Sequence, residues 1–221
     1  MGEVKRVYVQ CPACRYIFRA PSVKGYVTVG RDADLCPKFP GRLSDGSRLI
    51  QSAVTMCPAC FFASQEEFGA LALGPDERHD IEERLGEDGL LRVFRASPPP
   101  WLPFHAAEIC GQERGYRARD LGDICLRASW VCRKEKEQPF ESTFQLRAVR
   151  YFMRSLEREG LSGRELSVTT YLVGELNRRL GHHREALNWY VNAGRTLNDE
   201  RLAWLDRLIS RQSKLAREQA A

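Results

Sequence analysis

Two identical Cys-Pro-Ala-Cys segments constrain the fold of this chain more than any other feature of its sequence. One spans Cys11 to Cys14, and the other spans Cys57 to Cys60. Each Cys-x-x-Cys turn can aim two sulfur atoms at one point, so two turns supply the four ligands of a tetrahedral site. We predict that Cys11, Cys14, Cys57 and Cys60 bind one zinc ion (Zn2+). Four thiolates leave no open position for water, so the ion would be structural.

The main alternative to the predicted zinc site is a set of disulfide bonds. The chain has eight cysteines, which would suggest disulfides in a small secreted protein. However, it has 221 residues, and no apolar signal-peptide core precedes Cys11. It also lacks the run of about 18 apolar residues that a membrane-spanning helix needs. We therefore expect a cytoplasmic protein that does not associate with membranes.

The weak point of the zinc prediction is the distance between the two pairs. Cys14 and Cys57 are 43 positions apart, which is more than a compact zinc ribbon uses, and a Pro- and Gly-containing insertion at residues 37–47 would account for it. A thioredoxin-like redox pair is one alternative, although no helix-forming run follows Cys14 as that fold requires. Two reduced pairs without a ligand are the other.

Other polar and cysteine residues could extend the predicted site. Cys36 and Asp34 could replace a ligand or lie just outside the ligands, although an ordinary loop cysteine is the simpler interpretation of Cys36. We expect Asp32 and Asp34 to accept hydrogen bonds from turn N–H groups or to pair with Arg31. The cysteines of the second half are expected to pack in the core, because cysteine is among the most buried residue types; they are Cys110, Cys125 and Cys132.

The residue pattern along the sequence predicts an α+β protein in three parts. Residues 1–63 read as a small zinc-ribbon-like β unit. Within it, residues 26–29 are predicted to form one strand, which ends at Gly30. Residues 64–103 read as short helices, the first opened by a Ser64 to Glu67 capping box, followed by a Pro-rich connector. Residues 104–217 show apolar side chains at helical spacing, interrupted by turn signals, which predicts about six helices in hairpin order.

The segment 171–193 resembles a tetratricopeptide repeat, a pair of antiparallel helices. Small residues occupy the positions where the two helices approach closely, and large ones fill the groove between them. The small residues are Gly174, Gly181, Ala186 and Ala193, and the large ones are Leu187 and Tyr190. Because a single repeat does not fold alone, we expect the flanking helices to complete a stack with a concave surface.

Taken together, these motifs resemble the bacterial family of uncharacterised proteins called domain of unknown function 2225. The motifs that carry the resemblance are the two Cys-Pro-Ala-Cys pairs, Asp32-Ala-Asp34, Phe61-Phe-Ala63, Leu126-Arg-Ala-Ser-Trp130 and the segment 181–193. Cys36 departs from the family pattern, and Phe61 stands where the family leads us to expect glycine. The resemblance implies a fold and no established activity.

The residues favour a binding protein over an enzyme. None of the four histidines lies in a metalloprotease motif or beside a cysteine, and no glycine-rich phosphate loop is present. We therefore predict an adaptor that binds an unidentified protein partner through its helices.

Nucleic-acid binding is our second choice for the function of the chain. Residues 1–60 hold all of the net charge of +5, and they carry basic and aromatic side chains that could contact phosphates and bases. These side chains are Arg15, Arg19, Lys24, Arg31, Tyr16, Phe18 and Tyr26. A thiol redox protein is the third possibility.

Overall fold

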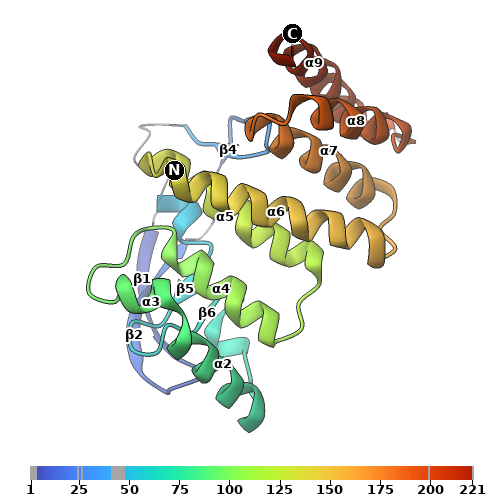
Figure 1. Ribbon diagram of the computed structural model, residues 1–221. Helices are drawn as coiled ribbons and strands as arrows, with labels where there is room; N and C mark the ends of the chain where they lie inside the picture. Colours follow the sequence, from blue (N-terminus) through green and yellow to red (C-terminus); the bar gives the residue numbers. More distant parts are fainter. Residues whose placement is uncertain (1–3, 24, 26, 41–47, 199, 221) are drawn as a thin grey trace.

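A computed structural model describes residues 4–23, 25, 27–40, 48–198 and 200–220 of the chain. Short strands with a cysteine cluster precede a series of helices, so the predicted α+β class is confirmed (Figure 1). The strands are β1 Val4–Gln10, β2 Ile17–Val23, β3 Gly30–Arg31, β4 Pro37–Lys38, β5 Thr55–Met56 and β6 Ala63–Ser64. The helices are η1 Phe68–Ala70, α2 Pro75–Glu87, α3 Gly89–Val93, α4 Leu102–Glu113, α5 Ala118–Glu135, α6 Gln138–Arg158, α7 Gly163–Arg179, α8 His183–Arg195, η2 Glu200–Leu202 and α9 Ala203–Ala220.

The strands pair as three separate two-stranded antiparallel sheets. The longest is the β1–β2 hairpin, in which Val9 lies opposite Phe18 and Tyr8 lies opposite Arg19. Side chains alternate between the two faces of a strand, so the hairpin has one inward face and one exposed face. Ala20 is buried on the inward face, whereas Tyr8 is largely exposed on the other.

The strand predicted at residues 26–29 is wrong for the residues that the structure describes. Residues 27–29 are not in a strand, and Val27 and Val29 are exposed. Residue 26 lies outside the described part, as do residues 41–47 of the predicted insertion. The ladder begins only at Gly30, in the short β3–β4 pair. Alternating β-branched residues favour a strand, but no neighbouring strand offers these valines a buried face.

The helical half agrees with the expectation of about six helices, since α4 to α9 follow one another within the described residues. Each of these helices packs against its neighbour in the chain, and α5 and α6 share the most extensive contact. Figure 1 shows β1, β2, β5 and β6 gathered with α2, α3 and α4 at one end of the molecule and α7 to α9 at the other, with β4 lying beside α7. None of the helices in the described ranges has the length and apolar character needed to cross a bilayer.

Small residues set the close approach of two helix pairs. A Cβ atom on Gly122 of α5 would lie 2.4 Å from the ring of Phe152 on α6, and one on Gly174 of α7 would lie 2.9 Å from the ring of Tyr190 on α8. Ala186 and Ala193 are fully buried in the same α7–α8 hairpin. Gly181 is small for another reason: it lies in the turn at a φ of +85° and nothing crowds its Cβ position. The tetratricopeptide assignment stays a prediction.

The segment between the strands and α4 contains the helices η1, α2 and α3, in line with the short helices expected there, but its first residues differ from the prediction. Ser64 does not open a helix, because it pairs in β6 and its hydroxyl accepts from the Glu66 N–H, leaving only the η1 turn at Phe68. The Pro-rich stretch ends at Trp101, which is fully buried and stacks on Phe140 at 4.2 Å. The Pro-rich stretch is therefore exposed at residues 97–98, is packed against the helices at Trp101, and runs directly into α4 at Leu102.

A cluster of ion pairs joins the N-terminal unit to the helices. The Asp34 carboxylate is fully buried and accepts from Arg133 of α5 at 2.7 Å, and Arg179 of α7 lies 3.5 Å away. The Tyr171 hydroxyl donates to the Ala33 carbonyl at 2.7 Å. The loop between β3 and β4 is thereby fixed on two helices that are more than ninety positions away in the sequence.

Candidate metal centre

Both Cys-Pro-Ala-Cys segments form the same kind of turn directly after a strand. The first follows β1 and the second follows β5. In each turn the first cysteine accepts and donates one backbone hydrogen bond, and these bonds hold the two cysteines of the turn on the same side. The bonds are Arg15 N–H to Cys11 O (3.0 Å), Cys11 N–H to Tyr16 O (2.9 Å), Phe61 N–H to Cys57 O (2.9 Å) and Cys57 N–H to Phe62 O (2.8 Å).

The residue after each second cysteine adopts a left-handed backbone conformation. The φ angle is +65° at Arg15 and +63° at Phe61. Glycine takes this conformation without a steric penalty, whereas other residues lose roughly 1–2 kcal/mol. This explains why the family resemblance leads us to expect glycine at position 61. Phe61 is tolerated because its buried ring packs in the core and lies under Arg95 at 5.6 Å.

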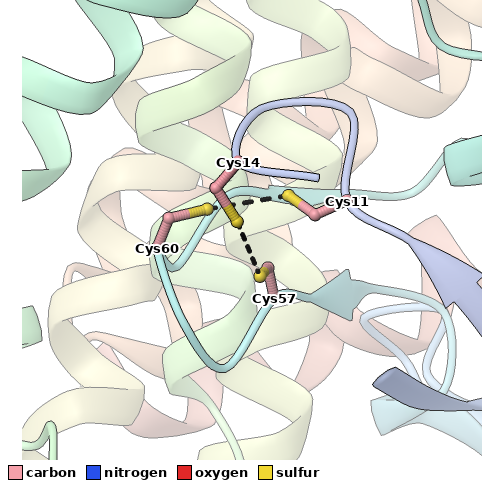
Figure 2. Close-up of side chains that lie close together, drawn as sticks. All are labelled: Cys11, Cys14, Cys57 and Cys60. Carbon is pink, nitrogen blue, oxygen red and sulfur yellow. Dashed lines mark hydrogen bonds between the residues drawn. The ribbon is translucent and has the colours of Figure 1, made fainter. Parts of the chain in front are cut away.

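The four sulfur atoms converge between the two turns. Their Sγ atoms all lie within 4.8 Å of one another, with Cys11 to Cys60 at 3.6 Å and Cys14 to Cys57 at 3.7 Å (Figure 2). Four sulfurs bound to one tetrahedral zinc ion at about 2.3 Å would lie about 3.8 Å apart. Sulfur positions and donor chemistry therefore fit such an ion, and the ion would need little rearrangement of the turns.

Hydrogen bonds among the sulfurs shift the pKa values of the thiols in opposite directions. The pKa of Cys57 is lowered, chiefly by its hydrogen bond with Cys11, whereas those of Cys11 and Cys60 are raised by the same set of sulfur contacts. Like charges this close cannot all ionise without a compensating cation. The backbone N–H groups of Ala13 and Cys14 favour the Cys11 thiolate and partly offset this repulsion.

Helix α4 contacts the residues that follow the second cysteine turn. The Ala63 N–H donates to the Cys110 sulfur at 3.4 Å, and both residues are buried. Phe62 is fully buried and its ring lies 5.3 Å from that of Phe68. Sequence reasoning assigned Cys110 only to the core. Nothing in its local sequence indicates the backbone bond to Ala63, because that bond exists only after β6 has docked on α4.

Cys36 and Asp34 do not belong to the sulfur cluster. Among the described residues, the group that could hold a metal consists of the four cysteines of the two turns. Asp34 instead accepts from Arg133 and from the Cys36 backbone N–H, and the Cys36 thiol donates to the Pro37 carbonyl at 3.8 Å. The expectation that Asp34 could serve as an alternate ligand is corrected by this pairing, since its buried carboxylate lies outside the sulfur group and is paired with the partly exposed Arg133. Asp32 pairs with Lys38 and not with Arg31.

The sequence of the chain matches the model of one protein family. A family model described as "Uncharacterized protein conserved in bacteria (DUF2225)" matches residues 5–219. The chain belongs to the DUF2225 family. No curated protein and no solved structure matches the DUF2225 chain.

The motifs that suggested the DUF2225 family lie at two places in the structure, apart from the segment 181–193, which forms the turn before α8 and most of α8. The two Cys-Pro-Ala-Cys turns form the sulfur cluster, whereas Asp34 and the helix segment 126–130 lie where the N-terminal unit meets α5. Trp130 of that segment is buried at this junction with its indole N–H unpaired among the described residues. The DUF2225 motifs therefore mark one metal-type cluster and one junction between the two halves.

Proposed function

We propose that this protein is a non-enzymatic binding protein whose N-terminal unit is held together by one structural zinc ion. The convergence of four sulfurs from two distant turns carries this proposal. A site with four thiolates holds a borderline-soft ion such as zinc and leaves no coordination position for a substrate. The ion would link β1 to β5, which share no sheet. It would therefore supply stability that short two-stranded sheets lack.

Native mass spectrometry and elemental analysis of the full-length protein test the metal assignment. We expect one zinc ion per chain, lost when Cys57 and Cys60 are both replaced by serine. Cys125→Ser is the matched control, because Cys125 is fully buried in α5 and belongs to no such cluster. Asp34→Asn should also retain the ion. Undiminished zinc in the Cys57→Ser, Cys60→Ser variant would refute the site.

The binding role is assigned to the helical hairpins. Stacked helix pairs present an extended surface, and apolar side chains remain exposed on three of these helices: Leu146 of α6, Val191 of α8 and Leu215 of α9. Each is a single exposed residue, so a partner would have to recognise the shape of the stacked helices as well as these apolar side chains. The partner that we propose is a protein.

Cross-linking of the full-length protein in a bacterial lysate tests the adaptor role. We expect a protein whose cross-links map to α6–α9 and whose recovery falls when Val191 and Leu146 are replaced by glutamate. Val93→Glu, at an exposed apolar position on α3 and outside α6–α9, is the control for added negative charge. Equal recovery with all variants would contradict an adaptor role for the helices.

A second candidate function is binding of single-stranded nucleic acid. The exposed face of the β1–β2 hairpin carries Arg6, Tyr8 and Arg19, and the Arg19 guanidinium lies 5.5 Å from the Tyr8 ring. Arg6, Arg19 and Arg48 line a groove of about 900 Å3 that contains no acidic side chain among its described walls. Basic and aromatic groups on one face suit phosphates and bases. Lys24 and Tyr26, which we also considered, lie outside the described residues.

Salt dependence separates this second candidate from the first. If the groove binds RNA, the affinity of the full-length protein for a single-stranded oligonucleotide should fall steeply as salt rises, because bound phosphates release counterions. Arg6→Gln with Arg19→Gln should weaken binding and flatten the salt response. The control pair is Arg150→Gln with Arg164→Gln, both exposed on helices. Absence of binding at low salt would remove this candidate.

A further inference from the structure

A second cavity lies between the N-terminal unit and α5, away from the sulfur cluster. We name it the α5 cavity. It measures about 180 Å3, and its walls come from the segments 28–39 and 49–53 and from α5. Most of the wall is apolar, formed by Leu35, Pro37, Phe39, Leu49, Ile50 and Ala53. The volume suits a ligand smaller than a typical drug-sized molecule.

The polar side chains of the α5 cavity can all donate hydrogen bonds. Arg31, Arg127 and Trp130 can only donate, whereas the Thr28 hydroxyl can also accept. Arg127 and Trp130 lie three positions apart and therefore share a face of α5, and Arg31 comes from the end of β3. The indole N–H of Trp130 is buried and has no acceptor among the described residues. Among the residues that the structure describes, no aspartate or glutamate lines the cavity. An unpaired buried donor is costly, so this lining favours an occupant that accepts hydrogen bonds.

Neighbouring carboxylates do not neutralise the two arginines. Asp123, one helical turn before Arg127, pairs with Arg119. Asp32, next to Arg31, pairs with Lys38, and Asp34 pairs with Arg133. Within the described ranges, no ion pair joins Arg31 or Arg127 to a carboxylate. The positive charge of the cavity is therefore left for a ligand.

The walls of the α5 cavity are held in place before any ligand binds. Leu35 follows the buried Asp34, which is fixed to α5 through Arg133 at 2.7 Å, and the Ala33 carbonyl accepts from Tyr171. Gln51 of the other wall donates to Glu135 on α5 at 3.2 Å. A site whose walls are preorganised loses less entropy on binding than a mobile one.

We infer that the α5 cavity binds a small organic acid, in which a carboxylate meets Arg31, Arg127 and Trp130 while a short apolar body fills the aliphatic wall. Guanidinium groups form charge-assisted hydrogen bonds with carboxylates, and the indole N–H would gain the acceptor that it lacks. The carboxylate belongs either to a free acid or to the C-terminal residue of a polypeptide. This inference goes beyond the proposed function and does not depend on the metal.

Isothermal titration of the full-length protein with 4-methylpentanoate tests the inference. We expect saturable binding, and we expect the uncharged isostere 4-methylpentanamide to bind at least tenfold more weakly. The tripeptide Gly-Gly-Leu identifies the source: tighter binding than the free acid assigns a polypeptide C-terminus, and weaker binding assigns a free acid. Inorganic phosphate should compete poorly, because it gains nothing from the apolar wall.

Four variants locate the binding. Arg127→Gln should weaken binding of 4-methylpentanoate at least tenfold, and Trp130→Phe, which keeps an aromatic ring but loses the N–H, about fivefold. Ala53→Phe should abolish binding by filling the cavity while leaving every charge in place. Arg150→Gln on the exposed face of α6 is the control and should bind like the unmodified protein.

Two outcomes would overturn the inference: no saturable binding of any of the acids, or binding that Arg127→Gln and Ala53→Phe leave unchanged. Zinc content measured on the same preparations separates this test from that of the metal centre. A sample that holds zinc and binds no acid contradicts only the α5 cavity. A sample that binds the acid without zinc contradicts only the metal assignment.

Discussion

At the scale of single residues, the two cysteine turns contain one residue each with the same left-handed backbone conformation but with a side chain in a different environment. Arg15 and Phe61 hold equivalent positions and nearly equal φ angles. Arg15 is exposed, whereas Phe61 is buried and packs under Arg95. The same substitution to glycine should therefore change stability in opposite directions at the two sites.

Arg15→Gly should raise the free energy of unfolding by about 1 kcal/mol, because it removes left-handed strain and no buried contact. Phe61→Gly should lower it by about 2 kcal/mol, because the loss of a buried ring outweighs the relief of strain. Urea denaturation of the metal-loaded protein measures both. A destabilised Arg15→Gly variant would show that the φ angle carries no strain.

At the scale of secondary-structure elements, the α5–α6 pair depends on the absence of a side chain at Gly122. The Phe152 ring occupies the space in which a Cβ atom would lie, at 2.4 Å. Because both residues are buried, neither helix can move away without opening the core. The hairpin is thus held by one close approach as well as by its apolar stripes.

Gly122→Ala should lower the free energy of unfolding by about 2 kcal/mol, even though alanine is the better helix former. Gly86→Ala in α2 is the matched control, because nothing lies within 4 Å of its Cβ position. That variant should be neutral or slightly stabilised. Thermal unfolding followed by circular dichroism compares the two, and similar melting temperatures would argue against the close packing of Phe152 on Gly122.

At the scale of the whole molecule, Asp34 connects the half that contains the sulfur cluster to the helical half. Its carboxylate is fully buried and pairs with arginines from two helices. Removing one partner of a buried pair leaves an uncompensated charge, which costs more than the pair itself gains. The junction, and the α5 cavity beside it, should therefore be sensitive to this single carboxylate.

Asp34→Asn should lower the free energy of unfolding by about 3 kcal/mol. Hydrogen exchange followed by mass spectrometry should show faster exchange in residues 27–40 and at the facing surface of α5, with little change in α8 and α9. Asp120→Asn is the control, since Asp120 forms an exposed pair with Arg117 and such pairs contribute little. Uniform exchange changes along the chain would mean that Asp34 stabilises the fold globally and does not join two parts.

The sequence alone determined the local features of this protein. Spacing and residue type indicated the two cysteine turns, the small N-terminal β unit and the series of helices, because each depends on neighbours within a few positions. The family resemblance also came from such motifs, and the match over residues 5–219 confirms it. The glycine expected at position 61 is explained by the left-handed backbone that the structure shows there.

Only the tertiary structure decided which distant groups meet. The convergence of the four sulfurs, the pairing of Asp34 with Arg133 and Arg179, and the bond from Ala63 to Cys110 all join segments that lie far apart in the chain. The strand predicted at residues 26–29 failed for the same reason, since a strand needs a partner that local propensity does not supply. Long-range contacts depend on how whole elements pack, and that information is spread over the entire sequence.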